Sequence, residues 1–83
     1  MNASELQQLI EAHLPDAEVI VRGDDGRHFQ AIVVSPSFEG KLPVAQHRMV
    51  YAALGERVQK DEVHALALNT YTPAAWAREQ GQA

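Results

Sequence analysis

The four histidines carry most of the chemistry that this sequence could perform, because the chain contains no cysteine. His64 lies in the stretch VHALALNTYTPAAW, at a position where a strand of a small domain normally has valine or isoleucine. If this stretch is extended, alternation puts His64 on one face with Leu66 and Leu68. An imidazole in this position is either a hydrogen-bonded structural residue or a metal ligand. In the second case, the remaining ligands need another source.

The other three histidines carry weaker signals. His28 opens a segment whose alternation puts it on the face opposite Phe29, so it is either a second ligand or an ordinary solvent-facing residue beside a turn. His47 falls on the apolar side of a predicted helix, which favours a half-buried packing role. His13 lies near the end of the first predicted helix, where a protonated imidazole suits the helix dipole, and we assign it no function.

Composition narrows the class of protein. The 83 residues predict a single domain over residues 1–83, with 46% hydrophobic and 22% charged residues as in globular proteins. Without cysteine, the chain has no disulfide, no cysteine-type zinc site and no self-contained cysteine-ligated iron–sulfur cluster. The net charge of -4 disfavours a general nucleic-acid binder. No signal peptide or membrane-spanning run is visible, so we expect a cytoplasmic protein.

An enzymatic function is not expected from these residues. The sequence shows no nucleophile–base pair with a supporting carboxylate and no glycine-rich phosphate loop. Its acidic residues Asp24, Asp25, Asp61 and Glu62 fall in predicted turns, where solvation explains them. We therefore predict a binding protein.

The N-terminal half predicts a helix followed by a hairpin. Ser4 is placed to cap a first helix, which Pro15 ends at Leu14. The segments AEVIVRG and HFQAIVVS have the composition of strands, and the short DDG stretch between them predicts a tight turn. The two strands should therefore pair antiparallel.

The C-terminal half predicts helices around a third strand. PSFEG suggests a brief helical turn, Pro43 opens a longer helix, and Thr72-Pro73 caps and opens a last one. The apolar stripe expected on the long helix is Val44, His47, Tyr51, Leu54 and Val58, with Val50 and Ala53 alongside. VHALALNT is the third strand, expected to pair parallel to a hairpin strand through a right-handed crossover. The order α-β-β-α-α-β-α predicts an α+β two-layer sandwich, a three-stranded sheet with helices on one face.

Three segments, VVSPSFEGK, QHRMVYAAL and VHALALNTYTPAAWARE, resemble the BolA family across nearly the whole chain. The short GDDGR connection is most similar to that of the IbaG (YrbA) subgroup of bacterial BolA-like proteins. The resemblance implies a class II KH-like fold, in agreement with the element order above. It also implies a link to stress response and a transcription-regulator label.

The resemblance further implies partnership with a monothiol glutaredoxin of the C-G-F-S type. In such heterodimers a 2Fe–2S cluster is shared, with thiolates from the glutaredoxin and a glutathione and a histidine from the BolA protein. That histidine matches His64, and His28 is the candidate for the family's second, variable ligand. Alone, the chain should bind no cluster and be a monomer or weak homodimer.

Two nucleic-acid alternatives stay open, and both centre on the long helix. The turn before it resembles part of a helix-turn-helix, which would offer Gln46, His47 and Arg48 to base edges. A KH domain would clamp a nucleic-acid backbone at the stretch Gly40-Lys41-Leu42-Pro43, with Lys41 nearby. Proline in place of the second glycine removes an N–H donor, so RNA binding of this type should be weak. We also expect DNA binding, if present, to be weak.

Overall fold

The computed structural model describes residues 2–23, 25, 28–55 and 65–81, and it confirms the predicted α+β class and element order. The expected brief helix is a single 3-10 turn, η1. In chain order the elements are α1 (Ala3–His13), β1 (Glu18–Arg22), β2 (His28–Val34), η1 (Pro36–Phe38), α2 (Pro43–Leu54), β3 (Ala65–Tyr71) and α3 (Pro73–Gly81). None of the helices in these described ranges is long and apolar enough to cross a membrane.

The three-stranded sheet has the order β1-β2-β3, with β2 in the centre. β1 and β2 pair antiparallel, with Glu18 opposite Val34 and Arg22 opposite Gln30. β2 and β3 pair parallel. Both predicted pairings are therefore confirmed, and α2 lies in the connection that parallel strands require.

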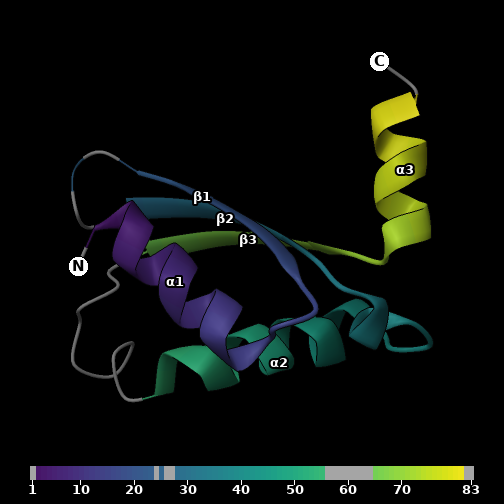
Figure 1. The fold of residues 1–83 in the computed structure, drawn as a ribbon, viewed down its shortest axis with the longest axis horizontal. Coiled ribbons are helices and arrows are strands. Elements are labelled where there is room, and N and C mark those ends of the chain that lie inside the picture. The colour runs from purple at the N-terminus through teal and green to yellow at the C-terminus, as the bar shows by residue number, and fades with distance from the viewer. Residues whose placement is uncertain (1, 24, 26–27, 56–64, 82–83) are drawn as a thin grey trace.

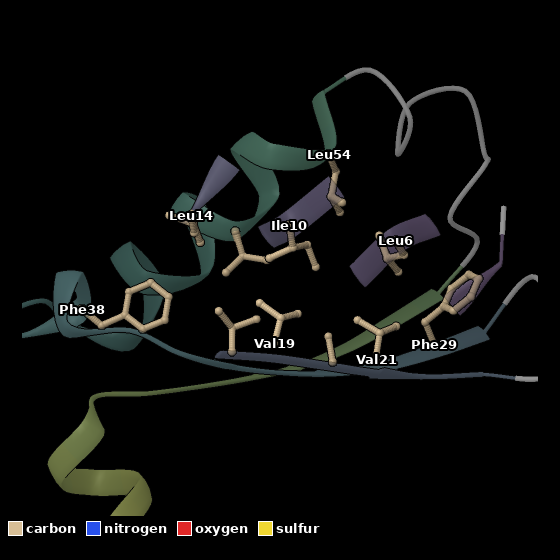
Figure 2. Packing of buried hydrophobic residues seen from close by; sticks show 11 residues of the cluster. Leu6, Ile10, Leu14, Val19, Val21, Phe29, Phe38 and Leu54 are labelled. Carbon is tan, nitrogen blue, oxygen red and sulfur yellow. The ribbon is translucent and has the colours of Figure 1, made fainter. Parts of the chain in front are cut away.

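α1 and α2 cover one face of the sheet, and the hydrophobic core lies between the two layers (Figures 1 and 2). Figure 2 shows side chains from both layers pointing into this space. The buried cluster consists of Leu6, Ile10, Leu14, Val19, Val21, Phe29, Ala31, Val33, Phe38, Val50 and Leu54. Alternation along β2 puts its odd-numbered residues from Phe29 to Val33 into this core and leaves His28 and Gln30 exposed on the other face.

α3 differs from the expectation that all helices lie on one face. It extends from the end of β3 on the opposite side of the sheet from α1 and α2 (Figures 1 and 2) and contains no buried residue. Its main anchor is the ring of Trp76, whose centroid lies 5.0 Å from that of Tyr71. Thr72 caps it as predicted, since its Oγ1 accepts a hydrogen bond from the backbone N–H of Ala75 at 3.2 Å.

The first helix begins two residues earlier than predicted. Its N-cap is Asn2, whose Oδ1 accepts a hydrogen bond from the backbone N–H of Glu5 at 2.8 Å, so Ser4 lies inside the helix. Asparagine and serine are equally favourable N-caps, and in this structure Asn2 takes the N-cap position instead of Ser4. α1 also blocks part of the sheet edge, because Gln7 Oε1 accepts a hydrogen bond from the backbone N–H of Val21 at 3.2 Å.

The buried face of α2 is rotated from the predicted stripe. The helix buries Gln46, Val50 and Leu54, whereas Val44 is 57% exposed and Tyr51 is 40% exposed. The stripe prediction is therefore wrong for Val44 and Tyr51, and its last member, Val58, lies outside the described residues. This orientation of α2 buries the polar side chain of Gln46, which is tolerated because that side chain makes hydrogen bonds within the protein.

Where β1 begins and β2 ends, the carboxylate of Asp16 accepts hydrogen bonds from the hydroxyls of Ser35 and Ser37. Ser35 is fully buried, and its Oγ donates to Asp16 Oδ1 at 2.9 Å. Ser37 Oγ donates to the other carboxylate oxygen of Asp16. These hydrogen bonds, from Ser37 first and Ser35 second, hold the pKa of Asp16 below its usual value of 3.8. The loop after α1 is thereby tied to the loop after β2.

Candidate functional site

The candidate site lies at the end of the sheet where β1 ends and both β2 and β3 begin. His28, the first residue of β2, is the register partner of Ala65, the first residue of β3. An open hollow at this end brings together residues from α1 and all three strands. It is lined by Ala3, Val21, Arg22, His28, Phe29 and Leu66, among others.

One carboxylate holds both the backbone and the ring of His28. Asp25 Oδ1 accepts a hydrogen bond from the backbone N–H of His28 at 2.8 Å. Its other oxygen, Oδ2, lies 2.7 Å from Nδ1 of the His28 ring. The two side chains are 60% and 50% exposed for His28 and Asp25, respectively. The pair therefore sits at the surface, within reach of a partner molecule.

This geometry determines which ring nitrogen can act as a ligand. An ionised carboxylate only accepts hydrogen bonds, so Nδ1 must carry the proton that it shares with Asp25. In a neutral imidazole the lone pair then belongs to Nε2. Metal-binding histidines commonly have this arrangement, in which one nitrogen binds the metal and the other donates to a carboxylate.

The hairpin backbone approaches His28 closely at Gly23. A Cβ atom added to Gly23 would lie 2.6 Å from the carbonyl oxygen of His28 and 2.8 Å from Cδ1 of Phe29. Only glycine fits this close contact without a shift of the backbone. Gly23 therefore helps to set where the first residue of β2 lies.

The principal predicted ligand, His64, lies outside the described residues, so its role stays a prediction. The described chain resumes at the next residue, Ala65, opposite His28. Within the described part of the chain, no three or more His, Cys, Asp or Glu side chains are gathered so as to hold a metal ion. His28 is therefore a candidate for one ligand position at a shared site.

The predicted nucleic-acid-binding residues of α2 and of the turn before it do not form one surface. Lys41 and Arg48 are exposed, and His47 is half-buried, as expected for a packing residue. Gln46 is only 8% exposed. Its Nε2 donates to the carbonyl oxygens of Phe38 at 3.2 Å and Lys41 at 2.9 Å, and its Oε1 accepts from Thr70 Oγ1 at 2.7 Å.

Gln46 is thus buried and hydrogen-bonded within the fold, which weighs against the alternative in which it reads base edges. Its amide ties the turn before α2 to strand β3, so it cannot face a groove of DNA without breaking these bonds. The turn before α2 is stabilised by its own backbone hydrogen bond. Gly40 has a φ of 76°, and the backbone N–H of Lys41 donates to the carbonyl of Phe38 at 3.1 Å. Pro43 has no N–H to offer a phosphate.

The sequence model of the BolA-like protein family matches residues 3–75. This chain belongs to the BolA-like family. Over 80 residues it is 39% identical to the acid stress protein IbaG of Escherichia coli K12, covering 96% of this chain and 94% of that protein. The predicted family and its resemblance to the IbaG subgroup are therefore confirmed.

Solved BolA structures have the same fold. The structure of a BolA protein homologue from Coxiella burnetii gives a TM-score of 0.82 at 44% identity, covering 94% of this chain and 99% of that one. The BolA domain of SufE1 from Arabidopsis thaliana gives a TM-score of 0.73 at 31% identity, covering 87% and 92%. The similarity to the Coxiella chain thus extends over almost the full length of both BolA-like proteins.

Asp25 is the residue of the site that sequence reasoning missed. It was interpreted as a solvated turn residue, like its acidic neighbours. Its spacing of three residues before His28 was the available signal, because Asp commonly accepts a hydrogen bond from a backbone N–H a few residues further on. The contact with the imidazole could not be inferred from this spacing alone.

Proposed function

We propose that this BolA-like protein pairs with a monothiol glutaredoxin of the C-G-F-S type and shares a 2Fe–2S cluster with it through histidine. The observation that carries the proposal is the orientation of His28, whose Nδ1 is engaged by Asp25 at the start of β2. His64, the principal ligand candidate, directly precedes the residue paired with His28. The family membership supports the same role.

The residues of this chain fit one side of such a site. Imidazole is a good ligand for iron, and His28 is exposed enough to meet a ligand set from another molecule. Because the chain has no cysteine, thiolates must come from the glutaredoxin and a glutathione. When bound, a cluster with mixed histidine and cysteine ligation has a higher reduction potential than an all-cysteine one.

The cellular role that we propose is iron–sulfur cluster trafficking or iron and stress regulation in the cytoplasm. A relative matched along almost its whole length is named an acid stress protein, which supports a link to stress. The proposal assigns no enzymatic reaction to this chain.

The test is a titration of holo-glutaredoxin with the protein and its histidine variants, followed by visible absorption and circular dichroism. Wild type should shift the cluster spectrum, because an imidazole replaces a thiolate on one iron. His64→Ala should abolish the shift and cost only about 1 kcal/mol of unfolding free energy. His28→Ala should reduce the shift, and His47→Ala should leave it intact. A wild-type spectrum for His64→Ala, with a lower melting temperature only, would refute the assignment.

DNA binding through α2 and the turn before it is the second candidate function, supported by the exposed Arg48 on the helix and Lys41 in the turn. The burial of Gln46 removes one of its predicted base contacts. The net charge of -4 opposes it further. We therefore rank it below cluster sharing.

A further inference from the structure

We propose that Asp25 is a positioning residue that selects the ring tautomer and orientation in which His28 can bind a metal through Nε2. The inference rests on the proposed function, because it concerns how this chain prepares a ligand for a shared cluster. The role assigned to Asp25 could not be inferred from the polar composition of the turn.

The two contacts of Asp25 restrain His28 more than either would alone. With Oδ1 on the backbone N–H of His28, the carboxylate cannot turn without losing its bond to the start of β2. With Oδ2 at 2.7 Å from Nδ1, the imidazole cannot rotate without losing its bond to the carboxylate. The imidazole of His28 is thus held in one orientation by Asp25, although both side chains are exposed.

The tautomer follows from the same contacts. Neutral histidine in water favours the form with the proton on Nε2, which leaves Nδ1 as the basic nitrogen. The carboxylate of Asp25 reverses this preference, because it can only accept a hydrogen bond and Nδ1 must therefore carry the proton. Nε2 then has the lone pair that ligation needs, before any partner arrives.

A simpler explanation is that Asp25 only caps the hairpin turn through the backbone of His28. Asp25→Asn separates the two explanations. The amide oxygen can still accept from the backbone N–H of His28, and Asn caps turns as well as Asp does. The amide nitrogen, however, would face Nδ1 as a donor. The ring would then have to carry its proton on Nε2, the tautomer that cannot bind a metal through that atom.

The first measurement uses the protein without any cluster. Long-range proton–nitrogen NMR correlations report which ring nitrogen of His28 carries the proton, at a pH well above the ordinary imidazole pKa of about 6.5. We expect the proton on Nδ1 in wild type and on Nε2 in Asp25→Asn, with similar melting temperatures. Glu18→Gln is the charge-matched control, since it removes one exposed negative charge from β1, and it should keep the wild-type tautomer. The same tautomer in wild type and Asp25→Asn would overturn the inference.

The second measurement adds holo-glutaredoxin to the same variants. Asp25→Asn should reproduce the reduced spectral shift of His28→Ala, whereas Glu18→Gln should match wild type. If the tautomer changes in Asp25→Asn but both Asp25→Asn and His28→Ala give the wild-type spectrum, His28 is not a ligand and the inference fails. The proposed function would survive that result as long as His64→Ala still abolishes the shift. Loss of the wild-type shift itself would refute both.

Discussion

The two ends of strand β2 use polar side chains in opposite ways. At its C-terminal end, next to η1, Ser35 is fully buried and Gln46 is 8% exposed, and both make hydrogen bonds to distant segments. At its N-terminal end, His28 and Asp25 pair with each other while staying 60% and 50% exposed. Figure 1 shows these ends on opposite sides of the molecule.

The difference separates what holds the fold from what is available to a partner. A buried polar group must be satisfied internally, so its hydrogen bonds serve stability and any substitution is costly. An exposed pair contributes little to stability because water competes for both groups. Substitutions near η1 should therefore affect stability, whereas those of His28 and Asp25 should affect the proposed ligand site.

The largest loss of stability is expected for Gln46→Glu. The change keeps the shape of the side chain but replaces the NH₂ group that donates to the carbonyls of Phe38 and Lys41 with a second acceptor. Repulsion between acceptors in a buried site should lower the free energy of unfolding by about 3 kcal/mol or more. Denaturant unfolding measures it. Gln30→Glu, on the exposed face of β2, is the matched control and should stay within about 0.5 kcal/mol of wild type.

Gly23→Ala should show that the backbone at the hairpin end is less tolerant than its side chains. The added Cβ would collide with the backbone of His28, which cannot move without shifting the strand. We expect a loss of about 1–3 kcal/mol, comparable to overpacking, measured by thermal unfolding. In Gly81→Ala the Cβ meets no atom within 4 Å, so this variant should be no less stable than wild type. An unchanged melting temperature for Gly23→Ala would contradict the close contact.

The hydrogen bonds of Asp16 with Ser35 and Ser37 should make part of the free energy of unfolding depend on pH. Hydrogen bonds from Ser37 and Ser35 lower the pKa of Asp16 in the folded state below 3.8. A lowered folded-state pKa means that the stabilisation is fully present above 3.8 and is lost as pH falls through the lower value. Asp16→Asn should therefore lose stability near neutral pH and show a shallower decline in acid. Unfolding curves from neutral to strongly acidic pH test this, with Glu79→Gln correcting for the lost charge. If the free energy of unfolding of Asp16→Asn and of wild type changed in parallel with pH, the stabilising role of the Asp16 hydrogen bonds would be contradicted.

The smallest effect is expected for Arg48→Ala. Arg48 is exposed on α2, so its removal should leave the free energy of unfolding within about 0.5 kcal/mol of wild type. Any DNA binding should be weak and fall steeply with salt, because few cations oppose the net charge of -4. Fluorescence anisotropy across a salt series measures it. Tight, sequence-selective binding at physiological salt that depends on Arg48 would reverse our ranking of the two functions.

Local signals in the chain were enough to predict the elements and their order. Pro15, Pro43 and Pro73 mark helix boundaries, and alternation around Phe29 identifies the buried face of β2. These features act within a few residues, where backbone geometry and side-chain periodicity are decisive. The family could be predicted in the same way, from segments that are contiguous in the sequence.

The tertiary structure alone decided which polar side chains are buried. Gln46 can be buried because Thr70, 24 residues away, donates a hydrogen bond to its amide oxygen. Ser35 can be buried because Asp16, 19 residues before it, accepts a hydrogen bond from its hydroxyl. The face of α2 that points inward depends on such a long-range contact as well, since Thr70 binds the buried side chain of Gln46. Even the short-range pair at the hairpin needed the turn to fold, because only the folded backbone brings both oxygens of Asp25 to the N–H and the ring of His28.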